Sequence, residues 1–192
     1  MSESAKINRS RSRIQQALAG LLKDKDYCDI TVAELIKKAD VGKTTFYRHY
    51  ERKLDVFLAM HHSLFDTLLE DLTVREDWLS LTPRPSVIAM LSRISAQSSF
   101  RRSVAYKLGN DAPQAHRQLR CNLTTLIEQR LTSAFDTDVF IIPLPSLAST
   151  LAAIYLDFIT QLFNDSLTSS VEEKATSLQR LTQANLRAAI ED

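Results

Sequence analysis

The sequence predicts an all-α protein of about nine helices, with an N-terminal helix-turn-helix domain followed by a larger helical domain. Turn-forming residues are scarce, since 192 residues contain only 3 Gly and 5 Pro, fewer than a sheet-rich chain needs. Apolar residues recur at helical spacing along most of the chain. Positive charge is concentrated at the start, where residues 1–53 hold 12 Lys and Arg against 7 Asp and Glu.

The chain opens with a polar segment and a first amphipathic helix. Residues 1–9 are polar and basic, and we expect a mobile arm there. From about Ser10 the apolar residues recur at the spacing of one helix face. They are Ile14, Ala17, Leu18, Leu21 and Leu22. The charged run at 23–26 is expected to end this helix.

Two short helices follow, separated by a tight break. Thr31 and Glu34 form a capping-box pattern that predicts a second helix ending at Ala39. The break spans residues 40–42, and a third helix is expected from Lys43 to about residue 50. Two short helices joined in this way are typical of a helix-turn-helix.

The rest of the chain predicts a second, larger helical domain. A long amphipathic helix is expected from residue 54 to about 72, then a connector over 75–85 that contains two prolines. Further helices are expected at about 86–96, 100–108, 113–135, 145–164 and 171–190. We therefore expect a helix-turn-helix domain over residues 1–53 and a larger helical domain over 54–192, to which the family resemblance described below assigns effector binding and dimerisation.

Bulk features exclude several classes of protein. Cys28 and Cys121 stand far apart without metal-ligand spacing, which argues against a disulfide framework and fits a reducing cytoplasm. The start of the chain lacks the apolar core of a signal peptide, and the most apolar stretch, 147–163, contains Ser149, Thr150, Asp157 and Thr160. We expect a cytoplasmic protein that does not contact membranes and holds no cofactor or metal. The basic first domain, at a net charge of +5, indicates a polyanionic partner.

The third helix carries two different faces at 100° per residue. Phe46 and Tyr50 point one way, and we expect them to pack against Leu35, Ile36 and Val41. The opposite face offers groups that reach base edges and phosphates in a major groove. These residues are Lys43, Thr44, Tyr47 and Arg48. A solvated helix with chance cations explains the composition equally well, but basic residues also flank the helix on both sides. Those flanking residues are Lys6, Arg9, Arg11, Arg13, His49, Arg52 and Lys53.

The run from Thr31 to Asp55 resembles the DNA-binding domain of TetR-family regulators. The segment 45–50, Thr-Phe-Tyr-Arg-His-Tyr, followed by Arg52-Lys53 carries the resemblance, which covers about residues 14–57. The remainder is similar to a TetR-type C-terminal effector domain in helix number and order, a looser match. The resemblance implies a regulator that binds a palindromic DNA operator as a homodimer and that a small-molecule effector can control.

The resemblance also implies roles for individual residues. Lys43 and Thr44 would meet bases, and Tyr47, His49 and Lys53 would hold phosphates. Thr31 and Thr45 would assist, and Arg48 could do either. This chain departs from the family pattern at the turn, where Asp40 replaces a glycine and Gly42 replaces a serine cap. Asp tolerates the left-handed backbone better than most residues, so we expect the turn to persist.

The last two helices are expected to form the dimer interface by the same resemblance. Their apolar stripes consist of Leu147, Leu151, Ile154, Phe158 and Leu162 on one helix and Leu178, Leu181 and Asn185 on the other. The alternative interpretation is that these stripes belong to the core of a single chain.

Two other functions compete with a DNA-binding regulator. One is a helical metal-binding protein or enzyme that uses His61, His62, Asp66 and Glu70, although a packed histidine explains His61 equally well. The other is a protein adaptor that has lost DNA binding. No Ser-His-Asp order, phosphate loop or HExxH motif is present, so we do not expect an enzyme. The effector site is not identified, and neither activation nor repression follows from these residues.

Overall fold

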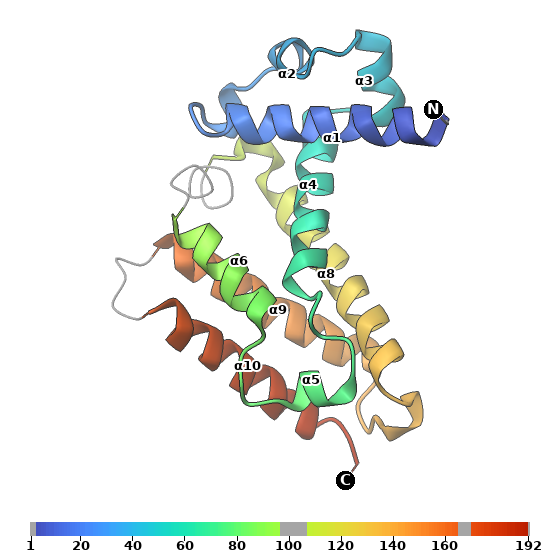
Figure 1. Cartoon of the computed structure of the whole chain (residues 1–192), viewed down its shortest axis with the longest axis vertical. Helices are drawn as coiled ribbons and strands as arrows, with labels where there is room; N and C mark the ends of the chain where they lie inside the picture. Colours follow the sequence, from blue (N-terminus) through green and yellow to red (C-terminus); the bar gives the residue numbers. More distant parts are fainter. Residues whose placement is uncertain (1–2, 97–106, 165–169, 192) are drawn as a thin grey trace. The chain divides into compact units, whose positions relative to one another are not determined.

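The computed structural model is all-α, as the sequence predicts (Figure 1). It describes residues 3–96, 107–164 and 170–191, with the side chains of 3–6 and 162–164 excepted. Its α-helices are α1 (Glu3–Leu21), α2 (Val32–Ala39), α3 (Lys43–His49), α4 (Lys53–Leu68), α5 (Arg75–Leu79), α6 (Pro85–Ala96), α8 (Ala112–Ala134), α9 (Leu144–Asn164) and α10 (Val171–Arg187). Short 3₁₀ helices in the described ranges are η1 (Tyr27–Asp29), η2 (Gly109–Asp111) and η3 (Thr137–Val139).

The structure corrects two expectations about helix limits. Helix α1 already begins at Glu3, so residues 3–9 are helical and not a mobile arm; no Gly or Pro interrupts the helix there. The expected connector over 75–85 contains helix α5, which the carboxylate of Asp77 stabilises by accepting a hydrogen bond from the backbone N–H of Val74. Most of the helix expected at 100–108 lies outside the described residues, and its last two residues, Lys107 and Leu108, are not helical.

The chain divides into two compact units. The first contains the chain up to His61 and, among the described residues further along, Lys107–His116. The second contains His62–Ala96 and the described residues from Arg117 onward. Helices α4 and α8 therefore contribute residues to both units. None of the helices in the described ranges has the length and apolar character needed to cross a bilayer.

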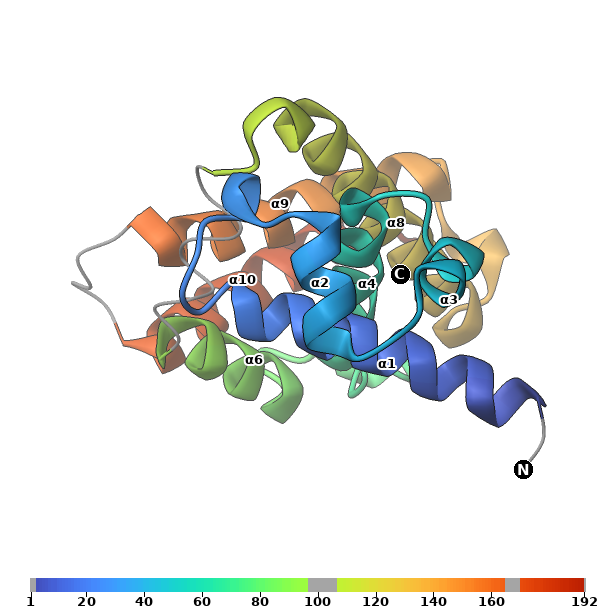
Figure 2. The same cartoon turned by 90° about the horizontal axis from the view of Figure 1, so that it is seen from above.

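The first unit is held together by the apolar face of α1. Helices α2 and α3 both contact α1 and lie on one side of it (Figures 1 and 2). Ile14 and Leu18 of α1 are fully buried, as are Leu35 of α2 and Phe46 of α3. Each large apolar side chain buried in this way stabilises the fold by roughly 1.5–3 kcal/mol relative to exposure.

In the second unit several helices pack against α10. Helix α10 contacts α5, α6 and α9, and α6 also contacts α9. Trp78, Leu151 and Tyr155 are fully buried in this unit, and the hydroxyl of Thr182 donates to the hydroxyl of Tyr155 across 3.4 Å. An isolated antiparallel bridge between Phe140 and Ile190 joins the segment before α9 to the residues after α10.

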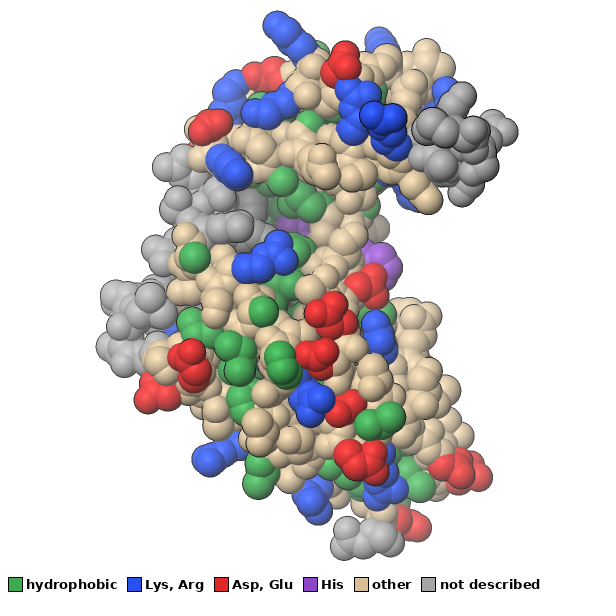
Figure 3. Space-filling model, viewed as in Figure 1, with side chains coloured by type: hydrophobic (Ala, Val, Ile, Leu, Met, Phe, Trp, Pro, Cys, Tyr) green, Lys and Arg blue, Asp and Glu red, His purple; other side chains and the backbone are tan. Residues whose placement is uncertain are grey.

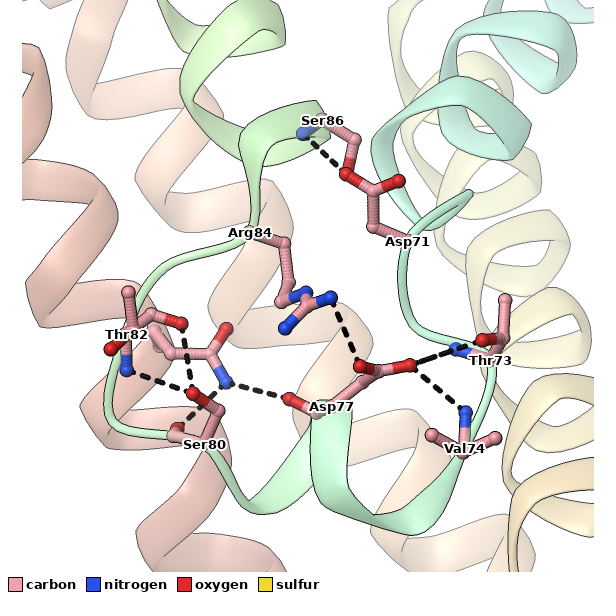
Figure 4. Close-up of polar contacts among 9 residues, drawn as sticks. Asp71, Thr73, Val74, Asp77, Ser80, Thr82, Arg84 and Ser86 are labelled. Atoms are coloured by element: carbon pink, nitrogen blue, oxygen red, sulfur yellow. Dashed lines mark hydrogen bonds and ion pairs between the residues drawn. The ribbon is translucent and has the colours of Figure 1, made fainter.

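A polar network fixes the segment between α4 and α6 (Figure 4). The carboxylate of Asp77 accepts hydrogen bonds from the backbone of Thr73 and Val74 at 3.0 and 3.1 Å and forms an ion pair with Arg84 at 3.0 Å. The side-chain amide of Gln179 on α10 donates to the carbonyls of Asp77 and Ser80 at 3.3 and 3.0 Å. The network thus ties α5 both to the segment before it and to the last helix.

Candidate nucleic-acid interface

The turn between α2 and α3 has the geometry of a helix-turn-helix. Thr31 is the N-cap of α2, and the capping box with Glu34 is present, as the sequence predicts. Helix α2 ends at Ala39, and its C-cap Asp40 adopts the left-handed conformation with φ 48° and ψ 54°. A single left-handed residue redirects the chain at once. Gly42 then precedes α3 in extended conformation.

The two faces of α3 separate as the sequence predicts. Phe46 is fully buried and Tyr50 is 4% exposed, whereas Tyr47 is 49% exposed. The hydroxyl of Tyr50 accepts a hydrogen bond of 3.0 Å from the amide of Gln15 on α1, so the end of α3 is fixed to α1. Gln15 carries no sequence signal for this role, because its partner lies 35 residues away.

The opposite face of α3 presents polar groups to solvent. Lys43, Thr44 and Arg48 are exposed together with Tyr47, and Thr45 and His49 are partly exposed. No ion pair among the described residues involves Lys43 or Arg48, so both cations remain available for an anionic ligand. In Figure 3, Lys and Arg side chains are the main charged groups over α1 to α3.

His49 differs electrostatically from its cationic neighbours. Burial lowers the pKa of His49 below its ordinary value, and the nearby charges of Arg11 and Arg48 lower it further. The imidazole is therefore neutral at about pH 7 and offers a hydrogen-bond donor without a full charge.

Thr31 is engaged within the chain. Its hydroxyl accepts a hydrogen bond of 3.2 Å from the N–H of Glu34, and its own N–H donates to the Glu34 carboxylate at 3.0 Å. Lys25 forms an ion pair with the same carboxylate. The hydrogen bond from Lys25, with those from Thr31, lowers the pKa of Glu34 to about 2. The carboxylate of Glu34 thus already lies at the start of α2, where the resemblance places Thr31 near a phosphate.

Lys53 is also engaged within the chain. It is the first residue of α4 and half-buried, and its ammonium donates to the carbonyl oxygens of Tyr27 and Ile30. Burial lowers the pKa of Lys53 below its ordinary value. Tyr27 in turn donates from its hydroxyl to Asp111 at 2.7 Å. Neither Tyr27 nor Asp111 stands out in the sequence as a partner, since they lie 84 residues apart.

The structure places the expected dimer residues in two groups. Leu147, Leu151 and Leu178 are buried within the single chain, so they have no area left to cover against a second copy. Ile154, Phe158 and Asn185 are partly exposed and Leu181 is exposed. The side chain of Leu162 lies outside the described residues. The stripes therefore belong in part to the core, with a second group accessible at the surface.

The histidines of α4 do not come together as a metal site. His61 is buried, its Nδ1 lies 2.8 Å from the carbonyl oxygen of Phe57, and its ring contacts that of Phe57 in a tilted arrangement with centroids 4.1 Å apart. His62 is exposed and lies 4.0 Å from the carboxylate of Asp66. Among the described residues no three His, Cys, Asp or Glu side chains gather as metal ligands.

Comparison with known proteins gives a family match for the N-terminal part of the chain. Residues 14–60 match the bacterial regulatory proteins of the tetR family. An uncharacterized HTH-type transcriptional regulator, YxbF of Bacillus subtilis (strain 168), is 25% identical over 96 residues, which are 50% of this chain and 25% of the relative. The match thus spans about a quarter of the length of this curated relative.

Solved structures match almost the whole chain. A TetR-family transcriptional regulator from Syntrophomonas wolfei superposes with a TM-score of 0.65 at 14% identity, over 92% of this chain and 94% of its own. The TetR-family repressor FadR of Thermus thermophilus, solved in complex with lauroyl-CoA, has a TM-score of 0.57 at 20% identity, over 95% and 96% of the two chains. At these identities the likeness concerns the fold.

Proposed function

We propose that this chain, whose residues 14–60 match the tetR family of bacterial regulatory proteins, is a transcription regulator that binds a specific operator sequence as a homodimer. Its fold agrees with that of TetR-family regulators over nearly the whole chain. Among the described residues no group of three His, Cys, Asp or Glu side chains favours the rival metal site.

The observation that carries the proposal is the division of α3 into a buried and a polar face. Phe46 and Tyr50 hold the helix on the first unit, while Lys43 and Tyr47 project into solvent. A short helix held in this way can enter a major groove without unfolding any part of its support. Its exposed ammonium, hydroxyl, phenol and guanidinium groups suit base edges and phosphate oxygens.

The proposal assigns the exposed residues of α3 as follows. Lys43 and Thr44, at the start of the helix, contact base edges, as residues at the N-terminal end of a recognition helix do. Tyr47 and His49 donate to phosphates, Thr45 assists them, and Arg48 contacts either a base or a phosphate. Thr31 contributes by capping α2, since its hydroxyl accepts from Glu34.

A second copy of the chain completes the proposed regulator. One short recognition helix reads few base pairs, and two copies related by a two-fold axis read a palindrome. We assign the dimer contact to the accessible group on α9 and α10. These residues are Ile154, Phe158, Leu181 and Asn185. The buried residues Leu147, Leu151 and Leu178 of the same helices pack inside the chain beneath this contact.

An effector bound by the second unit is part of the proposal. FadR, whose fold this chain shares, was solved with a bound acyl-CoA, which supports a ligand-responsive second unit here without indicating the ligand. Activation or repression then depends on where the operator lies relative to the promoter.

The direct test is a selection of genomic fragments by the purified full-length chain. We expect the enriched fragments to share a palindrome whose half-sites lie about 34–36 Å apart, centre to centre, or a multiple of that spacing. The position of the palindrome relative to promoters would give the direction of regulation. Failure to enrich any sequence would reject the proposed function in favour of an adaptor that does not read DNA.

A further inference from the structure

We propose that Lys53 is a positioning residue of the DNA-binding unit, which fixes the turn before α2 to the start of α4, and is not a phosphate contact. This inference rests on the proposed function and reassigns one residue that the family resemblance places on the DNA backbone. It concerns residues of the first unit only.

The first support is the set of acceptors around the ammonium. Lys53 donates from Nζ to the carbonyl oxygens of Tyr27 and Ile30, the latter at 2.5 Å. Tyr27 begins η1 and Ile30 is its C-cap, directly before Thr31, the N-cap of α2. A single cation on α4 therefore binds both ends of the turn that leads into the helix-turn-helix.

The second support is the aromatic surface that covers the ammonium. Nζ lies 4.0 Å from the centroid of the Tyr27 ring, within the range of a cation–π contact. An ammonium has three N–H donors, and two of them are already directed at carbonyls. A DNA phosphate could use the remaining donor or would have to displace one of these acceptors.

The third support is that Tyr27 is itself held in place. Its side chain is buried, and its ring packs edge-on against Phe57 with centroids 5.5 Å apart, one turn further along α4. Its hydroxyl donates to Asp111 at 2.7 Å. The Tyr27 ring is thus fixed, and the Lys53 ammonium lies between this ring and the carbonyls of the turn.

The consequence for DNA reading follows from the position of η1. Helix α2 is short and starts two residues after Ile30, directly after its N-cap Thr31, so the carbonyls that Lys53 binds set where its first turn begins. Helix α3 follows after the turn at Asp40. Loss of the ammonium leaves the turn without these donors and lets both helices shift against α4. Base contacts depend on sub-ångström placement of side chains, so specific binding suffers more than non-specific binding.

The experiment compares full-length Lys53→Met, Lys53→Arg and Arg52→Met with the unaltered chain. Lys53→Met keeps the aliphatic stem and removes the ammonium, Lys53→Arg restores a cation, and Arg52→Met removes the neighbouring exposed cation as a control. The probes are a labelled duplex carrying the selected palindrome and a scrambled duplex of equal length. Affinities are measured against salt well below the unfolding temperature of every variant, and thermal unfolding is measured without DNA.

We expect Lys53→Met to unfold at a lower temperature without DNA. It should lose at least tenfold in the ratio of specific to scrambled affinity, keep the slope of log affinity against log salt, and recover partly in Lys53→Arg. Arg52→Met removes an exposed ion pair with Asp55, so it should leave the ratio unchanged and lower the DNA-free unfolding temperature less than Lys53→Met does. A slope smaller by about 1 with unchanged unfolding would make Lys53 a phosphate contact and overturn the proposal.

Two further outcomes are informative. Lower unfolding temperature with an unchanged affinity ratio would reduce Lys53 to a stabilising residue, which also overturns the proposal. If the unaltered chain binds the palindromic and the scrambled duplex with equal affinity, the proposed function fails and the positioning role fails with it. The DNA-free unfolding of Lys53→Met would then still show whether the ammonium holds the turn.

Discussion

Arg13 on α1 and Asp40 in the turn between α2 and α3 form an ion pair, with 2.6 Å between Nη2 and Oδ2. Asp40 is the single non-glycine residue with positive φ among the described residues. Its carboxylate therefore links the most unusual backbone position of the helix-turn-helix to the supporting helix. Both side chains are substantially exposed, so solvent screens the pair and its contribution to stability is about 1 kcal/mol or less.

Substitutions at Asp40 should separate backbone conformation from the ion pair. Asp40→Ala should lower the free energy of unfolding by about 1–2 kcal/mol, because alanine tolerates φ 48° poorly and cannot bind Arg13. Asp40→Gly loses the ion pair too but fits the left-handed turn, so it should lie within about 1 kcal/mol of the unaltered chain. Urea unfolding of both variants, with Arg13→Ala as the control for the pair alone, checks this. Equal losses in the alanine and glycine variants would contradict it.

Lys43 is expected to read a base. Lys43→Ala should weaken binding to the selected palindrome by roughly 1–3 kcal/mol and relax the choice of base at one position of each half-site. Lys37→Ala, which removes an exposed cation on α2, serves as the matched control and should leave that base choice intact. Fluorescence anisotropy against a panel of singly substituted duplexes measures both. The same loss on every duplex would show that Lys43 contacts the backbone instead.

His49 predicts a pH dependence of DNA binding. Its pKa in the free chain is below the ordinary value, through burial and the charges of Arg11 and Arg48. A phosphate oxygen beside the ring favours the protonated form, so the pKa rises in the complex and binding takes up a proton. Affinity should therefore increase as pH falls from about 8 to about 6, up to about tenfold per unit of pKa increase. His49→Gln should remove this dependence, and an unchanged pH profile in the variant would show that His49 is not its source.

Leu181 provides a test of the dimer contact. Its side chain is 43% exposed on α10, and the two-fold axis of a dimer would place it in the interface twice. Leu181→Glu should raise the dissociation constant of the dimer at least tenfold, because each copy then buries a charge without a partner. Leu81→Glu is the matched control, since Leu81 is 59% exposed but lies on neither α9 nor α10. Sedimentation equilibrium measures both, and an intact Leu181→Glu dimer would place the interface elsewhere.

Asp77 should make the second unit sensitive to acid. Burial raises the pKa of Asp77, but the hydrogen bonds from Thr73 and Val74 and the charge of Arg84 lower it more, so the pKa lies below its ordinary value. A lowered pKa stabilises the fold above the unfolded pKa of about 3.9, and this stability is lost as pH falls through the folded pKa. Asp77→Asn should therefore cost about 1–3 kcal/mol near pH 7 and progressively less below about pH 4. Urea unfolding across this range is the measurement, and a loss independent of pH would assign the effect to packing.

The local features of the helix-turn-helix could be predicted from the sequence because neighbouring residues create them. The capping box of Thr31 and Glu34 forms within a single turn, and the left-handed Asp40 follows from a residue type that tolerates it. The burial of Phe46 and exposure of Tyr47 follow from the helical period alone. Short helices such as α5 escaped prediction, since their stability comes from capping and from one buried side chain, Trp78.

The partners of individual polar groups and the split of the apolar stripes were decided by tertiary structure. Nothing near Lys53 in the sequence indicates that its ammonium binds carbonyls of Tyr27 and Ile30, and the spacing of Leu151 is the same for a core residue and an interface residue. The sequence by itself determined the helices, the turn and the faces they present, because these depend on residues within about one helical turn. Which groups remain free for DNA or for a second copy depends on residues brought together from distant parts of the chain, and no local spacing contains that information.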